Sequence, residues 1–180
     1  MTQLAHNRRI GLGLAALTCA VDQGSKWWVL GPLNLPAVHL MRPLVDPATP
    51  DMPLLPIFGF TFTQNFGVSL GLLTAGSEGQ RWALVGLTAA IALMVAVWLW
   101  RERLVGDIAA LGLVLGGAAG NIIDRAGRGY VVDFLDLHFG SYRPFLIFNL
   151  ADAAITVGVL IVLARSFLSR DKRPQPIPES

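Results

Sequence analysis

Four aspartates between residues 116 and 152 are the residues whose type and spacing could do chemistry: Asp124, Asp133, Asp136 and Asp152. They lie in a strongly apolar part of the chain, where an ionisable side chain is costly unless it is paired or faces a cavity. Two carboxylates that share a half-dry site cannot both ionise easily, so the pair supplies one acid and one base. Such a pair can activate a water against a peptide carbonyl and then protonate the leaving amine.

Other catalytic chemistries find little support. The histidines His6, His39 and His138 lie in unrelated segments, and the chain has neither an H-E-x-x-H motif nor a clustered ligand set for zinc. A G-x-S-x-G string occurs at residues 67–71, but no serine of the chain has a histidine plausibly beside it, so a serine nucleophile is not supported. The glycines of residues 116–120 have no Lys-Ser/Thr ending of a phosphate loop, and close helix packing explains them better. We therefore expect no metal and no cofactor.

Composition points to a membrane protein. Of the 180 residues, 53% are hydrophobic and only 14% are charged, whereas a soluble domain carries about 25% charged residues. The net charge of +2 does not indicate nucleic-acid binding, because the basic residues cluster at the ends of hydrophobic runs. The length allows one membrane-embedded domain, residues 1–180, and we expect it to act as a monomer.

Four apolar runs are long enough to cross a bilayer core of about 30 Å. Arginines and lysines flank the first run, the connection 101–103 and the last run, which predicts that both termini are cytoplasmic. Segments 31–80 and 126–147 then lie outside the membrane. The predicted spans are residues 10–30, 82–100, 104–123 and 148–167.

The outer segments carry weaker signals. Closely spaced prolines predict that no helix forms in residues 31–80, whereas the alternating residues from Ile57 to Gly67 predict strands of a small sheet. Residues 37–56 form either a substrate-facing flap or an insertion with little order. We expect Gly127 and Gly129 to end the third span and 130–139 to form an amphipathic helix at the interface. The tail, residues 171–180, is expected to be disordered.

This topology separates the four aspartates. Asp133 follows the exit of the third span and Asp152 begins the fourth, so both lie at the same outer depth. Asp124 either pairs with Arg125, Arg128 or Lys26, or takes part in catalysis, and Asp136 is expected to be solvated.

Asp22 and Lys26 lie four residues apart on one helical face, as a structural ion pair or as part of a site. A rival function is a small transporter or proton relay, which also uses intramembrane acids. That function needs acids at several depths, but the inner halves of the four spans lack them apart from Asp107 near the cytoplasmic end, so such a path would have no middle.

Five segments resemble lipoprotein signal peptidase, the aspartyl peptidase family also called signal peptidase II. They read DQGSK at 22–26, NFGVSLG at 65–71, GNIIDR at 120–125, VVDF at 131–134 and FNLAD at 148–152. The resemblance implies four transmembrane helices, a periplasmic sheet cradle and an interfacial helix in the bacterial inner membrane. It also implies cleavage of diacylglyceryl-modified prolipoproteins before the lipid-bearing cysteine.

Matched position by position, the resemblance implies that Asp133 and Asp152 are the catalytic pair. It also implies a set of polar residues that bind substrate or support the pocket, and membrane lipid as a further partner. Two departures from the family pattern are Ser69-Leu70, where alanine and phenylalanine are more usual, and a long proline-rich segment at 37–56. The supporting residues are Asp22, Lys26, Asn65, Asn121, Asp124, Arg125 and Asn149.

Overall fold

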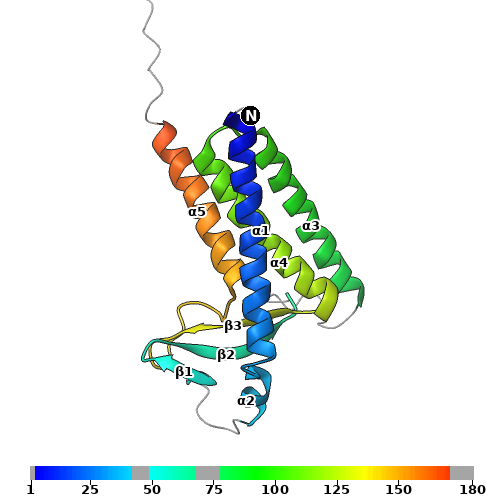
Figure 1. Cartoon of the computed structure of the whole chain (residues 1–180). Coiled ribbons are helices and arrows are strands. Elements are labelled where there is room, and N and C mark those ends of the chain that lie inside the picture. The colour runs from blue at the N-terminus through cyan, green and yellow to red at the C-terminus, as the bar shows by residue number, and fades with distance from the viewer. Residues whose placement is uncertain (1–2, 42–48, 68–77, 171–180) are drawn as a thin grey trace, which may run out of the picture.

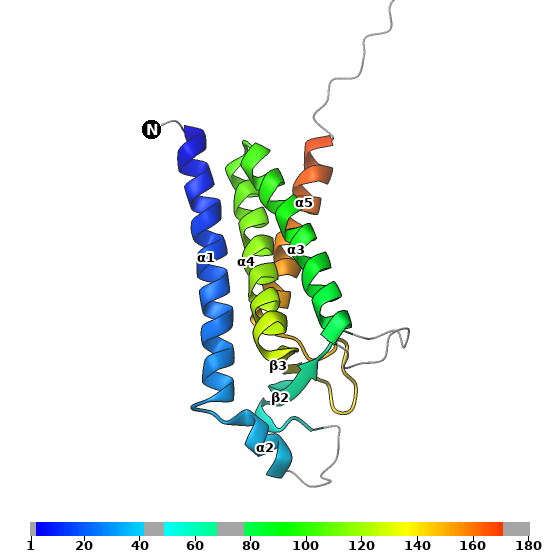
Figure 2. The ribbon, with the colours of Figure 1, turned by 90° about the vertical axis from the view of Figure 1, so that its right-hand side faces the viewer.

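The computed structural model describes residues 3–41, 49–67 and 78–170, except for the side chains of Ser169 and Arg170. Long helices form an upright bundle, and a small sheet with a short helix lies at one end of it (Figure 1). A view turned by 90° shows the sheet below the bundle as well (Figure 2). The long helices are α1 (Gln3–Leu30), α3 (Glu78–Arg101), α4 (Val105–Arg128) and α5 (Leu150–Arg170).

Three of these helices, α3, α4 and α5, are long and apolar enough to cross a membrane. They correspond to the second, third and fourth predicted spans. The first predicted span lies within α1, which also carries Asp22 and Lys26 and starts seven residues before the predicted boundary, at Gln3 rather than at residue 10. Polar residues in α1 make it less apolar than the other three helices.

Helix α4 lies at the centre and packs against α1, α3 and α5. Its small residues allow this, because a Cβ at Gly112 would collide with the backbone of Gly11 in α1. A Cβ at Gly117 would likewise meet the backbone of Ala151 in α5. The glycines of α4 therefore serve helix packing, as the sequence predicted.

The sheet has three antiparallel strands in the order β1 (Met52–Leu55), β2 (Phe58–Asn65) and β3 (Val131–Leu137). Strand β2 confirms the strand predicted from the alternating residues after Ile57. Thr63 of β2 pairs with Asp133 of β3, which fixes the position of this aspartate on the sheet. Residues separated widely in sequence thus meet in one layer.

The prediction of an amphipathic helix over residues 130–139 is wrong, because residues 131–137 form strand β3. The two acids of this segment, Asp133 and Asp136, lie three residues apart and mimic the polar face of a helix. Residues 131–134 and Asp136 are nevertheless all buried, and the backbone hydrogen bonds go to β2. Long-range pairing therefore outweighs the local periodicity.

The end of α4 also differs from the prediction. The helix continues through Gly127 and ends at Arg128, so only Gly129 releases it. Gly129 has φ 88° and donates its backbone N–H to the carbonyl of Arg125. Glycine adopts this left-handed conformation without steric cost, which explains why the helix ends here.

A short helix, α2 (Leu35–Met41), forms in the proline-rich segment, where the sequence predicted none. Pro36 is its second residue, a place where the missing N–H costs no helical hydrogen bond. Leu35 is fully buried in a core with Val29 of α1 and Phe134 of β3, so packing on the sheet stabilises α2. Three predicted features lie outside the described residues: much of the 37–56 segment (42–48), Ser69-Leu70, and the tail 171–180.

Candidate active site

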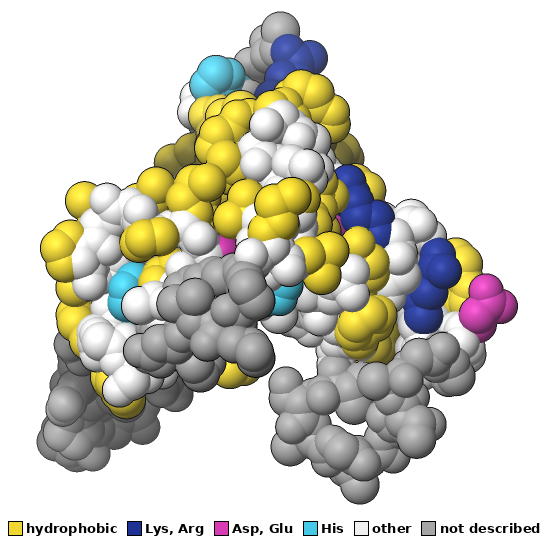
Figure 3. All heavy atoms as spheres, turned by 90° about the horizontal axis from the view of Figure 1, so that it is seen from below, with side chains coloured by type: hydrophobic (Ala, Val, Ile, Leu, Met, Phe, Trp, Pro, Cys, Tyr) yellow, Lys and Arg dark blue, Asp and Glu magenta, His cyan; other side chains and the backbone are white. Residues whose placement is uncertain are grey.

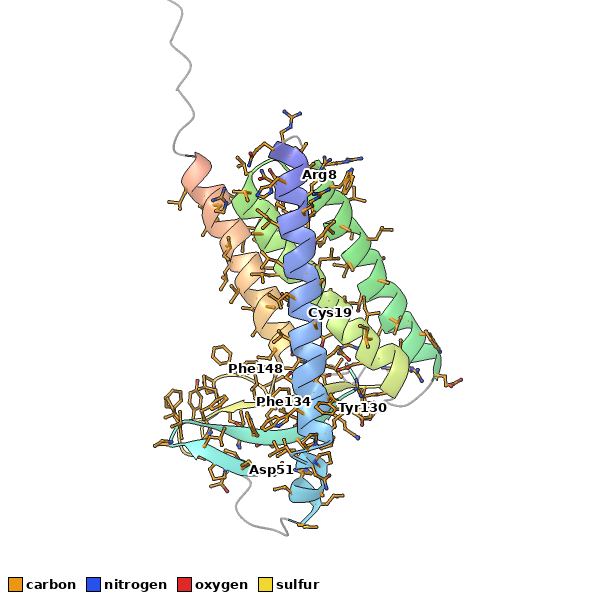
Figure 4. All side chains as sticks on the ribbon, viewed as in Figure 1. Arg8, Cys19, Asp51, Tyr130, Phe134 and Phe148 are labelled. Atoms are coloured by element: carbon orange, nitrogen blue, oxygen red, sulfur yellow. The ribbon has the colours of Figure 1, made fainter. Side chains whose placement is uncertain are left out.

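Asp133 and Asp152 meet where the bundle joins the sheet. Asp133 projects from β3, and Asp152 lies in the first turn of α5. Figure 4 labels two neighbours of these elements, Phe134 of β3 and Phe148 just before α5, at this same junction. The backbone N–H of Phe134 bonds to the carbonyl of Phe148 at 3.1 Å, which ties the two elements together.

Asn149 holds both carboxylates. Its side-chain amide donates to Asp133 Oδ1 at 2.6 Å, while its backbone N–H donates to Asp152 Oδ2 at 3.3 Å. The backbone N–H of Asp152 in turn donates to Asn149 Oδ1 at 2.9 Å. This reciprocal pattern is a helix-capping box, and it explains the three-residue spacing between Asn149 and Asp152.

Two further amides complete the arrangement. Asn65, at the end of β2, donates to Asp133 Oδ2 at 2.9 Å. Asn121 of α4 donates to Asp152 Oδ1 at 2.8 Å and accepts from Lys26 at 3.3 Å. The four carboxylate oxygens of the pair therefore each accept a hydrogen bond from a positioned donor.

The electrostatics of Asp133 suit an acid. Burial and, to a smaller extent, the negative charge of Asp152 raise its pKa to about 6, against the hydrogen bonds from Asn65 and Asn149. The side chain is only 1% exposed, so water compensates little for the charge. One carboxyl of the pair thus keeps its proton closer to neutral pH than an ordinary aspartate.

Asp22, Lys26 and Asp124 form a buried charge cluster behind the pair. Lys26 Nζ lies 2.8 Å from Asp22 Oδ2 and 2.8 Å from Asp124 Oδ2, and these side chains are fully buried. Asp22 Oδ1 accepts the backbone N–H of Ala151 at 3.0 Å. The cluster therefore fixes the start of α5, next to Asp152. Asp22 and Lys26 therefore form the predicted ion pair, and Lys26 also reaches Asn121, which bonds to Asp152. That they line a substrate site stays a prediction.

The surroundings of Asp124 fit the pairing interpretation. Besides Lys26, it bonds to Arg128, and it accepts the backbone N–H of Val132 at 3.2 Å. Gln23 joins the same cluster, with Nε2 3.0 Å from Asp124 Oδ1 and 3.1 Å from the carbonyl of Gly120. Sequence reasoning did not single out Gln23, although it lies within the DQGSK segment.

The prediction that Asp136 is solvated is wrong. Its side chain is completely buried, with Arg143 Nε 2.9 Å from Oδ1 and the hydroxyl of Thr61 2.7 Å from Oδ2. Burial alone would raise its pKa, but the bonds from Arg143 and Thr61 hold the pKa below its usual value. Because residues three apart in a strand face opposite sides, Asp136 points away from Asp133. Neither Thr61 nor Arg143 stood out in the sequence.

Arg125 lies near the pair, and one nitrogen of its guanidinium makes no hydrogen bond to the described residues. Its Nε is buried and has no hydrogen-bond partner among the described residues. It lines a hollow of about 180 Å³ with Phe66 and Leu84. Arg81 reaches from α3 to the carbonyl of Arg125 at 2.7 Å and so joins α3 to the end of α4.

Two larger hollows flank the aspartates. One, of about 620 Å³, lies between α2 and β2 and includes His39, Phe62 and Thr63. The other, of about 350 Å³, has Asp152 in its wall. On the face seen from below, hydrophobic side chains alternate with backbone and uncharged polar atoms, and few acidic atoms show (Figure 3).

Comparison with known proteins assigns the chain to a family. The family model for signal peptidase (SPase) II matches residues 14–168. The chain belongs to the signal peptidase II family. It is therefore a peptidase, and all five segments that carry the resemblance fall inside the matched range.

Relatives of known name agree. The lipoprotein signal peptidase of Rhizorhabdus wittichii is 48% identical over 93% of this chain and 91% of its own length. That of Sphingopyxis alaskensis is 45% identical over 93% and 90%. A bacterial membrane enzyme solved by the in meso method at 2.3 Å resolution has the same fold, with TM-score 0.68, 23% identity and 93% coverage of both chains.

Proposed function

We propose that this signal peptidase II removes signal peptides from diacylglyceryl-modified prolipoproteins by cutting before the lipid-bearing cysteine. The observation that supports this mechanism is that Asn149 donates hydrogen bonds to both Asp133 and Asp152. It holds two carboxylates together in a half-buried site, which is the requirement for an acid and base made from one residue type. In this scheme, hydrolysis of the peptide bond proceeds without a covalent enzyme–substrate intermediate.

The two aspartates take different roles. Asp152, ionised, removes a proton from a water whose oxygen attacks the scissile carbonyl carbon. Asp133, whose pKa is raised to about 6 chiefly by burial, is the carboxyl of the pair that carries the proton in this scheme, and it donates this proton to the carbonyl oxygen as the tetrahedral intermediate forms. When the C–N bond breaks, the proton taken from water passes from Asp152 to the leaving amine, and the proton on the former carbonyl oxygen returns to Asp133.

The supporting residues act through this pair or on the substrate. Asn65, Asn121 and Asn149 orient the carboxylates, and Asp22, Lys26 and Asp124 fix the helices that carry them. The spare Nε–H of Arg125 is a donor for a substrate carbonyl. Because one chain supplies all of these groups, we expect a monomer to be active.

We further propose that α1 is a fourth transmembrane helix and that the enzyme resides in the inner membrane. Both termini then lie in the cytoplasm and the sheet lies on the periplasmic side. In support, the start of α1, the connection 101–104 and the end of α5 lie together at the end opposite the sheet (Figure 1). Arg8, Arg101 and Arg103 belong to that end, as the positive-inside rule requires. Among the described residues, the acids of the helices do not form a path through the bundle, so a transporter is not favoured.

The test is cleavage of a lipid-modified precursor in detergent. Asp133→Asn and Asp152→Asn should each lower kcat by at least about 10³-fold, because the amide can neither take nor give the proton. Asp107→Asn, in the first turn of α4 where it pairs with Arg165, is the matched control and should retain near-normal kcat. Full turnover by a folded Asp133→Asn or Asp152→Asn enzyme would refute the pair.

A further inference from the structure

A hollow of about 350 Å³ lies directly against Asp152, between α5 and the segment that leads into it. Its volume falls within the roughly 300–1,000 Å³ typical of ligand pockets. Helix α5 forms one wall, and the end of β3 with the following segment forms the other. The lining residues are Leu137, Phe145, Leu146, Phe148, Asp152, Ala153, Thr156 and Val157.

The lining side chains favour an alkyl chain over a stretch of peptide as the occupant. Apart from Asp152 and Thr156, the wall consists of apolar side chains. The Thr156 hydroxyl already donates to the carbonyl of Asp152 at 2.8 Å, so no lining side chain has a spare donor. A peptide placed here would leave its carbonyls without partners, and that desolvation is costly. An alkyl chain has no such requirement.

The position of the hollow indicates where its occupant comes from. Thr156 and Val157 are exposed on α5, one of the helices apolar enough to cross a membrane. On the opposite wall, the side chain of Phe145 is 63% exposed, so the hollow is open on this side as well. The hollow is therefore continuous with the lipid-facing surface of α5, and an acyl chain can enter it sideways from the bilayer.

We propose that this hollow, the α5 pocket, binds one acyl chain of the diacylglyceryl group on the substrate cysteine. The proposal rests on the proposed function, and it adds the site at which the enzyme binds the lipid of its substrate. Because Asp152 is in the wall, a chain held here fixes the scissile bond of the same cysteine relative to the pair. Binding of a remote group would then position the reacting one.

The experiment measures cleavage of three synthetic precursors that differ only at the cysteine: dipalmitoylglyceryl, dibutyrylglyceryl and unmodified. The wild-type enzyme should show a lower KM for the long-chain precursor. Val157→Trp fills the pocket and should raise that KM by roughly tenfold, a loss of about 1.4 kcal/mol, with the short-chain KM unchanged. Val159→Trp is the matched control, because Val159 is similarly exposed on α5 but does not line the pocket.

A second variant tests the pocket in case Val157→Trp does not fold. Phe145→Ala removes part of the outer wall at an exposed position and should reduce the preference for long chains. The proposal is overturned if both variants keep the wild-type ratio of KM values, or if Val159→Trp raises the long-chain KM as much as Val157→Trp. The proposed function fails separately, if wild-type enzyme cleaves none of the three precursors.

Discussion

At the scale of single residues, two chemically identical side chains occupy different environments. Asp133 is almost wholly buried on a strand and accepts from two side-chain amides. Asp152 is less buried, sits in the first turn of a helix and accepts from one amide and one backbone N–H. The favourable end of the helix dipole reaches Asp152 but not Asp133. This difference supports the proposed roles, with Asp133 as the acid and Asp152 as the base.

The raised pKa of Asp133 predicts how stability depends on pH. The unfolded chain releases this proton near pH 3.9, whereas burial keeps it bound in the folded protein up to about pH 6. Stability contributed by Asp133 is therefore present below about pH 4 and is lost as pH rises through about 6. Relative to wild type, Asp133→Asn should gain on the order of 1–3 kcal/mol between pH 4.5 and 7.5, measured by thermal unfolding in detergent.

Asp136→Asn is the control for this prediction. Because hydrogen bonds outweigh burial and lower the pKa of Asp136, its folded and unfolded forms are both ionised above about pH 4.5. Its stability contribution is lost only at lower pH. The difference in unfolding free energy between Asp136→Asn and wild type should therefore stay constant across the same pH window. An equal pH-dependent gain in both variants would contradict the assignment.

At the scale of elements, helix α4 organises the site. It contributes Asn121, Asp124 and Arg125, and it packs against α1 and α5, which carry Asp22 and Asp152. The small residues of α4 bring these helices close enough for short polar contacts between them. Gly120, for example, lies against the carboxylate of Asp22.

Helix contact at Gly112 predicts a specific sensitivity. A Cβ there would collide with the backbone of Gly11, which cannot move aside as a flexible side chain could. Gly112→Ala should destabilise the protein by about 1–3 kcal/mol. Gly13→Ala, where a Cβ meets nothing within 4 Å, should be neutral or stabilising by up to about 1 kcal/mol. Thermal unfolding of both variants decides this, and equal effects would refute the close packing.

At the scale of the whole molecule, the arginines Arg8, Arg101 and Arg103 lie at the end of the bundle opposite the candidate catalytic pair. Arg8 stacks on the ring of Trp100 at 4.4 Å and donates to its carbonyl, which joins the start of α1 to the end of α3. Asp133 and Asp152 lie at the far end of the bundle, beside the sheet (Figure 1). This separation is what the proposed orientation in the membrane requires.

That orientation can be tested by labelling. Cys19 is the only cysteine in the sequence, so Cys19→Ala provides a background without thiols. In that background, a membrane-impermeant maleimide applied to spheroplasts should label Ser141→Cys, which lies on the sheet side. It should not label Arg103→Cys until the membrane is opened; both positions are exposed. The reverse pattern would invert the topology.

The sequence alone indicated a membrane protein, located the long apolar helices and proposed the residues of the candidate site. Long apolar runs are a local property of the chain, and Asp133 and Asp152 stood out because charge is costly beside such runs. Asn65, Asn121 and Asn149 followed from segments resembling a family. The structure brings these amides together with the aspartates.

Only the tertiary structure decided the local form of the outer segments. The acids at 133 and 136 have a helical spacing, but pairing with β2 makes residues 131–137 a strand and turns Asp136 towards Arg143. The α2 helix likewise depends on burying Leu35 against distant residues. Short segments have too little local preference to fix their own conformation, so contacts between residues far apart in the chain determine it.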